Sequence, residues 1–201
     1  MDYIAFIIAC VLFSLSPGSG AAVSINNVIV NGLRGASFGV IGLQSALAMH
    51  LMFIYLGIGV LVSQSPTLYN GIKYLGILYL MYLGIEKIVS SITNKNSFKL
   101  TGDKKKKLIL MKEGFAVNLT NPKSIIFLTA FLPQFINQDT GTGLQYLVLG
   151  GIVVLVDGLV MFLYCFGANS FKQFFAEEKT MRNVNFLFGL IFIGIAISLA
   201  M

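Results

Sequence analysis

The sequence predicts an all-α integral membrane protein with six transmembrane helices, built as two inverted three-helix repeats in which helices 1 and 4 are broken by proline. Three observations support this fold class. The chain has 201 residues, a mean hydropathy of +0.83 and only 11% charged residues, too little polar surface for a water-soluble domain of this size. Its apolar residues fall into six runs long enough to cross a bilayer, and two of these runs carry a proline motif at equivalent positions.

The expected spans follow these apolar runs in order. A crossing needs about 20 residues. The first run is too long for one straight helix, which indicates a break near Pro17, and the fourth run has Asn121 and Pro122 near its start. The six runs lie at about 3–31, 36–63, 68–90, 115–137, 143–168 and 184–201.

The first run is expected to be kept as a span rather than cleaved as a secretory leader. A leader starts with a positively charged segment. This chain instead begins Met1-Asp2-Tyr3 and has no Lys or Arg before Arg34.

Charge predicts the orientation of the spans. Of the 14 Lys and Arg residues, all except Lys73 lie at or beside the connections between spans 1 and 2, 3 and 4, and 5 and 6, with Lys87 counted among them. The positive-inside rule therefore places these connections in the cytoplasm and both termini outside. We interpret Lys104–Lys107 as a topology-setting loop, with a patch for anionic lipid or nucleic acid as the alternative. In the absence of tryptophan, tyrosines such as Tyr164 are expected as interfacial anchors.

Residues 1–201 are predicted to form one membrane domain made of two repeats. The repeats cover about 1–91 and 114–201 and are joined by a basic cytoplasmic loop at about 92–113. "LSPGS" at 15–19 aligns with "TNPKS" at 120–124, and because three helices is an odd number, the second repeat enters the membrane from the opposite face. Interrupted helices at matching positions of inverted repeats are typical of secondary transporters, whose binding site lies between the repeats. A proline kink without function is the alternative.

The two breaks supply the candidate binding groups. Proline removes an N–H and frees carbonyl groups, which in a bilayer must face protein or water. Freed N–H groups at 18–20 suit a carboxylate, helped by the positive end of the following half-helix. Spacings of three and four residues also predict one polar helix face at Ser16, Gly20, Ser24, Asn27 and Asn31, with a small-residue packing seam as the alternative. The predicted substrate-binding residues are Ser16, Pro17, Gly18, Ser19, Gly20, Ser24, Asn27, Asn118, Asn121, Pro122, Lys123 and Ser124.

Two ionisable residues are expected near the middle of the bilayer, Asp157 in the fifth span and His50 in the second. An intramembrane carboxylate is costly, so Asp157 is a candidate for binding a substrate ammonium group or a coupling proton, with helix locking as the alternative. His50 is a second candidate for proton coupling, or else a hydrogen-bonded packing residue. Gln44 adds a neutral polar group to the second span. Lys123 either extends to the cytoplasmic interface or attracts an anionic substrate group.

No motif for an enzyme, a cofactor or a metal centre emerges from the sequence. Cys10 and Cys165 lie in apolar runs without CxxC or Cys/His spacing and are interpreted as small buried hydrophobic residues. A membrane redox protein would need a thiol in each break. A metal-ion transporter would have to rely on His50 and Asp157, which are too few ligands for a dedicated site. A non-transporting scaffold is the remaining alternative, and it predicts no need for Asp157 or the prolines.

Several stretches carry a resemblance to a known family. They are "SPGSG" (16–20), "IKYLGILYLMYLGIEKI" (72–88), "EGFAVNLTNPKSIIFLTAFLPQFI" (113–136) and "NFLFGLIFIGIAISLA" (185–200), together with Asp157 in the fifth span. Through these stretches the chain resembles, over essentially its whole length, the LysE/RhtB family of bacterial amino-acid exporters. Ser19 stands where that family commonly has the second proline of a Thr-Pro-Gly-Pro motif.

The resemblance implies a secondary transporter in the bacterial inner membrane that exports amino acids or close derivatives from the cytoplasm. It also implies coupling to the proton gradient and no cofactor. We therefore predict an alternating-access carrier whose partners are a small amino-acid substrate, protons and the lipid bilayer, without nucleic acid. Exposed glycine-rich faces permit a homodimer.

Overall fold

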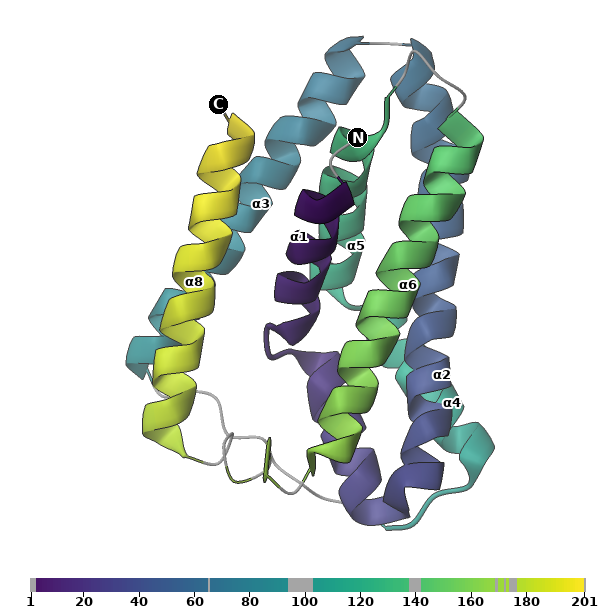
Figure 1. Ribbon diagram of the computed structural model, residues 1–201, viewed down its shortest axis with the longest axis vertical. Coiled ribbons are helices and arrows are strands. Elements are labelled where there is room, and N and C mark those ends of the chain that lie inside the picture. Colours follow the sequence, from purple (N-terminus) through teal and green to yellow (C-terminus); the bar gives the residue numbers. More distant parts are fainter. Residues whose placement is uncertain are drawn as a thin grey trace.

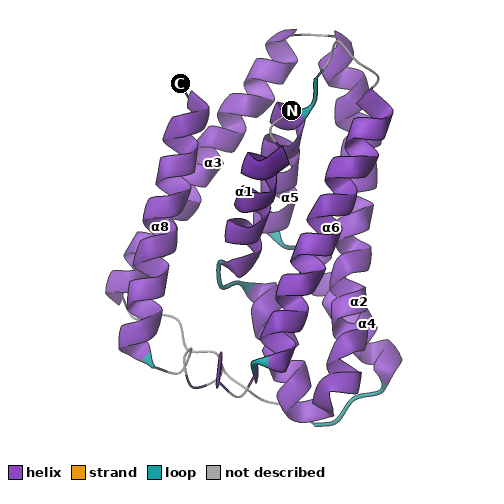
Figure 2. Ribbon diagram, viewed as in Figure 1, coloured by secondary structure: helices purple, strands orange, loops and turns teal. Residues whose placement is uncertain are grey.

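The computed structural model describes residues 3–64, 66–93, 103–137, 142–168, 170–171, 173 and 177–200, and these residues contain helices and no strand. Figure 1 shows long helices running roughly side by side, and Figure 2 shows short loops joining them. The helices are α1 (Tyr3–Leu15), α2 (Ser19–Gln64), α3 (Pro66–Thr93), α4 (Lys107–Leu119), α5 (Pro122–Phe131), the 3-10 helix η1 (Leu132–Phe135), α6 (Thr142–Phe166) and α8 (Glu178–Ala200).

The helices have the length and hydropathy of membrane spans. Among the described residues, four segments pass this test alone, and α4 with α5 and η1 passes it as a pair bent by 54°, which gives up to five candidate spans. At 13 residues, α1 is too short to cross alone. The all-helical membrane class is therefore confirmed, and the number six stays a prediction. The four single segments are Ser19–Gly57, Lys73–Thr93, Thr142–Phe166 and Glu178–Ser198.

The longest helix, α2, reverses direction at Gly32. Its 46 residues exceed one crossing, and Gly32 has φ 73° and ψ 172°, a conformation that glycine adopts without a steric penalty. In Figure 1 the α2 ribbon descends, turns at the lower end of the molecule and rises again. The reversal coincides with the boundary expected between the first two apolar runs.

Both expected interruptions are present. Residues 16–18, with Pro17, separate α1 from α2, and residues 120–121 separate α4 from α5. Asn121 caps α5 by accepting a hydrogen bond from the Lys123 N–H (3.1 Å), and Pro122 follows at the first helical position, where no N–H is needed.

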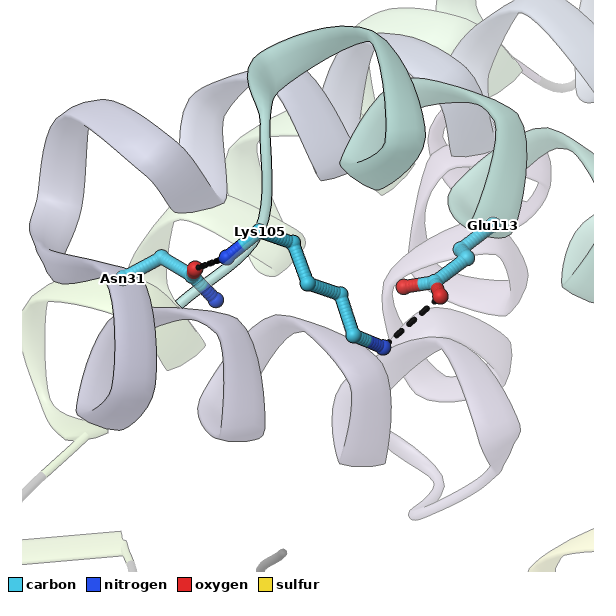
Figure 3. Close-up of polar contacts among 3 residues, drawn as sticks. All are labelled: Asn31, Lys105 and Glu113. Carbon is cyan, nitrogen blue, oxygen red and sulfur yellow. Dashed lines mark hydrogen bonds and ion pairs between the residues drawn. The ribbon is translucent and has the colours of Figure 1, made fainter. Parts of the chain in front are cut away.

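The basic loop predicted at about 92–113 gives way to a helix before its expected C-terminal boundary. Helix α4 begins at Lys107, inside the predicted 92–113 loop, because apolar residues start at Leu108 and Leu110 is buried. Before it, the Lys105 N–H donates to Asn31 Oδ1 (2.7 Å), and Lys105 Nζ pairs with Glu113 Oε1 (2.7 Å) (Figure 3). The bond to Asn31 fastens the start of α4 to the turn of α2, and the ion pair joins Lys105 to α4 itself. The loop residues 94–102 lie outside the described residues.

Packing brings the two breaks together at the centre of the molecule. Helices α1 and α5 lie side by side (Figure 1), and the rings of Phe13 and Phe127 stack with centroids 3.8 Å apart. Glycines allow close approach in the pairs α2–α4 and α3–α8: a Cβ added to Gly84 would lie 2.8 Å from the Gly189 carbonyl oxygen, and the reverse distance is also 2.8 Å. The pairing of α1 with α5 positions the end of each half-spanning helix beside the other break.

Candidate functional site

The two breaks meet at a small polar cavity, here called the central cavity. Five helices contribute to it, and its volume is about 30 Å³. It is lined by Phe13, Ser14, Ser16, Gly18, Gly20, Ala21, Leu43, Asn118, Asn121, Lys123, Ser124, Asp157 and Met161. The structure thus brings residues more than 100 positions apart in the sequence, such as Gly18 and Lys123, into one site.

Most of the residues predicted from the sequence line this cavity. They are Ser16, Gly18, Gly20, Asn118, Asn121, Lys123, Ser124 and Asp157. Pro17 and Ser19 line a second cavity on the other side of the first break, and Pro122 is exposed. Neither cavity is lined by Ser24, Asn27 or His50. The roles of all these residues in transport stay predictions.

Two residues of the predicted polar stripe pack between helices. The Ser24 hydroxyl contacts Met161 Sδ at 3.7 Å, and the Cys165 thiol lies 3.9 Å from the Ser24 carbonyl oxygen. Asn27 is buried beside Gly39, where an added Cβ would lie 2.5 Å from Asn27 Nδ2. Ser24 and Asn27 thus lie between packed helices, as expected for a packing seam rather than a binding site.

Lys123 connects the second break to the first. Its Nζ donates to the carbonyl oxygens of Phe13 (2.7 Å) and Ser16 (2.9 Å) and lies 4.4 Å from the centroid of the Phe13 ring. These carbonyls sit at the C-terminal end of α1, where unpaired carbonyl groups and the helix dipole favour a cation. The ammonium group is thus held inside the molecule rather than extended toward an interface.

Asp157 shares the central cavity with Lys123 without forming an ion pair with it. Asp157 Oδ2 accepts a hydrogen bond from Gln44 Nε2 at 2.7 Å. In the described part of the chain, the ion pair within 4.0 Å is Lys105–Glu113, at the surface. The cavity therefore holds an acidic and a basic side chain that do not neutralise each other by direct contact.

The helix starts at the two breaks differ in how they are capped. At α5, the Asn121 side chain satisfies one free N–H. At α2, the Gly18 carbonyl accepts the first helical bond from Ala22 N (3.0 Å), but glycine has no side chain to cap the N–H groups that follow. The N–H groups of the first turn of α2, at residues 19–21, are consequently open to an anion.

Three further side chains hold the broken helix ends. His50 Nε2 donates to the Leu119 carbonyl (3.2 Å) at the end of α4, and the Tyr164 hydroxyl donates to the Leu15 carbonyl (2.7 Å) at the end of α1. Lys87 Nζ donates to the Pro17 carbonyl at 2.8 Å.

Sequence reasoning misplaced two of these three residues. Tyr164, expected as an interfacial anchor, is only 3% exposed. Lys87, counted as a cytoplasmic loop charge, contacts the first break instead. The available signal for Lys87 was its position inside the apolar run at 68–90 rather than after it.

The chain is similar in sequence to several known membrane proteins. The chain is 38% identical to an uncharacterized membrane protein of Vibrio cholerae serotype O1, over 98% of this chain and 96% of the relative. It is 35% identical to homoserine/homoserine lactone efflux proteins of Salmonella typhi and Salmonella typhimurium, over 98% of this chain and 95% of each relative. No solved structure matches the chain. The model of the LysE type translocator family matches residues 11–201, which include both breaks and every residue that lines the central cavity, and the chain belongs to that family.

Proposed function

We propose that this protein is a secondary transporter that exports an amino acid or a close derivative from the cytoplasm, by alternating access and coupled to the proton gradient. We place it in the bacterial inner membrane with both termini outside. The observation that carries the proposal is the central cavity, where Asp157 and Lys123 face one space without pairing. Family membership makes the chain a translocator. The relatives named for homoserine favour a small zwitterionic substrate.

The groups around the cavity match the two ends of an amino acid. With Oδ2 of Asp157 bonded to Gln44, Oδ1 is the oxygen that receives the substrate ammonium group. The carboxylate binds the open N–H groups at the start of α2, next to the Lys123 ammonium. Ser16 Oγ is a further contact: Ser16 is 1% exposed, and this oxygen has no hydrogen-bond partner among the described residues.

Proton coupling is assigned to Asp157 rather than His50. A carboxylate in the middle of a membrane span is costly when it has no cation beside it, so Asp157 binds either the substrate ammonium group or a proton, but not both. His50 lies outside the central cavity, and its Nε2 holds the Leu119 carbonyl. That geometry suits a residue that positions the second break.

The contacts at the two breaks support the inverted-repeat arrangement. Tyr164 of α6 holds the end of α1, and His50 of α2 holds the end of α4. Each break is thus bonded by the second span of the other repeat, which is α6 for the first break and the part of α2 after Gly32 for the second. Two units related by a two-fold axis in the membrane plane would produce this exchange, and rocking of one unit against the other would open the cavity alternately to each side.

The test compares efflux by Asp157→Asn with that of the wild type and of Glu113→Gln. Cells are loaded with homoserine-containing dipeptides, and external homoserine is measured at equal membrane expression. Asparagine keeps the shape of Asp157 and a partner for Gln44 but loses the charge, so we expect efflux to fall at least about tenfold, as for a lost charge-assisted contact. Glu113→Gln removes a surface carboxylate and should leave efflux unchanged. Undiminished efflux by Asp157→Asn would overturn the assignment of the site.

A further inference from the structure

A second cavity lies against the first break, opposite the central cavity. Its volume is about 270 Å³, and Gly18 lines both cavities, so the Pro17–Gly18 segment separates them. The other groups that matter are Ser19 and Ala22 at the start of α2, Lys87 from α3 and Asn185 from α8.

The second cavity lies toward the end of the molecule that we propose to be cytoplasmic. Lys87 lies six residues before the end of α3 at Thr93, and Asn185 lies seven residues after the start of α8 at Glu178. At a rise of about 1.5 Å per residue, each is about 10 Å along its helix from that helix end. In Figure 1 the end of α3 and the start of α8 lie in the lower half of the molecule, above the turn of α2 at its lower end.

The polar groups of the second cavity fit both ends of a zwitterion. Lys87 Nζ uses one hydrogen for the Pro17 carbonyl (2.8 Å) and has two more for an anion, beside the open N–H groups of α2. Asn185 is 1% exposed, and its Oδ1 has no hydrogen-bond partner among the described residues. A buried acceptor without a partner is costly, which favours a ligand that brings a donor. Among the described residues that line the cavity, there is no Asp or Glu to compete for Lys87.

We propose that the second cavity is a loading site that binds a zwitterionic α-amino acid from the cytoplasm before it reaches Asp157. The carboxylate binds Lys87, and the ammonium group donates to Asn185 Oδ1. A carboxylate on the two free hydrogens of Lys87 attracts the ammonium group more strongly than a neutral carbonyl does, and so draws it away from the Pro17 carbonyl. Loading therefore loosens the Pro17–Gly18 segment and lets the substrate pass to the central cavity. This inference rests on the proposed export function.

Homoserine and homoserine lactone provide a direct test, because both carry an ammonium group and only homoserine has a carboxylate. Uptake of each labelled compound into inside-out membrane vesicles measures export from the cytoplasmic face. Lys87→Met should raise the half-saturating concentration of homoserine about tenfold, the effect of a lost charge-assisted contact, and that of the lactone by less than about twofold. Asn185→Leu should raise both. Lys73→Met, on the same helix near its other end, should change neither.

Protection of a cysteine gives a readout that does not need transport. Ala22→Cys is labelled with a membrane-impermeant maleimide from the cytoplasmic face; the native Cys10 and Cys165 are buried and give a low background. Homoserine should slow this labelling. Protection should persist in Asp157→Asn, which acts after loading, and disappear in Lys87→Met.

The outcomes separate the loading site from the export function. Wild-type vesicles that accumulate neither compound would contradict the export proposal. Vesicles that accumulate homoserine, but whose half-saturating concentration is unchanged by Lys87→Met and Asn185→Leu, would overturn the loading site alone. If a Lys87 variant fails to fold, the Ala22→Cys variant of the otherwise wild-type protein gives the answer. Labelling that homoserine does not slow would also overturn the loading site.

Discussion

Replacing Lys123 with methionine tests whether one ammonium group holds the two breaks together. The change removes the bonds to Phe13 O (2.7 Å) and Ser16 O (2.9 Å) and the contact 4.4 Å from the Phe13 ring centroid. Phe13 O keeps a bond from the Ser16 N–H (3.3 Å), so the Ser16 carbonyl is the one left without a partner.

The expected magnitude follows from these contacts. Hydrogen bonds between membrane helices contribute about 0.6–1.7 kcal/mol each, so two of them amount to about 1–3 kcal/mol. Loss of the ring contact adds about 0.5–2 kcal/mol to this cost. Replacing lysine with methionine also removes the cost of burying an ammonium group, and this gain offsets the loss of the ring contact by a comparable amount. We therefore expect the free energy of unfolding to fall by about 1–3 kcal/mol, with efflux reduced because the cavity loses its cation.

The assay is equilibrium unfolding in mixed micelles, followed by circular dichroism, with efflux measured in parallel. Lys105→Met is the matched control, because it removes a lysine ion pair at the surface and should cost no more than about 1 kcal/mol. If Lys123→Met unfolds at the same denaturant concentration as Lys105→Met, the ammonium group does not hold the breaks together and the reasoning is refuted.

Two further substitutions, Gly42→Ala and Tyr164→Phe, probe the packing around the site, and each has a control. Gly42→Ala should lower the free energy of unfolding by about 1–3 kcal/mol, because its Cβ would overlap the Met111 carbonyl. Gly194→Ala, where an added Cβ meets open space, should be neutral or stabilising by up to about 1 kcal/mol; equal melting temperatures for the two would contradict the close approach of α2 and α4. Tyr164→Phe removes the hydroxyl that holds the end of α1 and should cost about 1 kcal/mol and slow efflux. The exposed Tyr55→Phe serves as its control in both assays, and equal loss in the two variants would count against the role of Tyr164.

The sequence predicted the interruptions because they are properties of the backbone. A proline inside an apolar run breaks a helix wherever that helix lies, so the breaks at Pro17 and Pro122 were readable from the chain alone. The partners of the freed carbonyls were not readable in this way. Lys87 and Tyr164 reach the first break across 70 and 149 positions of sequence, and only tertiary packing decides which side chain arrives there.

The polar stripe on the first span shows a second limit of sequence reasoning. Of the residues in this stripe, Ser16 and Gly20 line the central cavity. It cannot say where a cavity ends along a helix, because a stripe continues for the length of the helix. Ser24 packs against α6 one turn further on, and Asn31 binds the Lys105 N–H at the far end.

The first break can move only by exchanging hydrogen-bond partners. Its carbonyls are held from opposite sides by Lys123, in the central cavity, and Lys87, in the second cavity. In a bilayer, a carbonyl released without a new partner would be strongly disfavoured. In the proposed transport cycle, a shift of the 16–18 segment toward one lysine lengthens the bonds to the other. In that cycle a carboxylate on either ammonium group would decide which bond is given up, and the two lysines would make this segment the two-state element of alternating access.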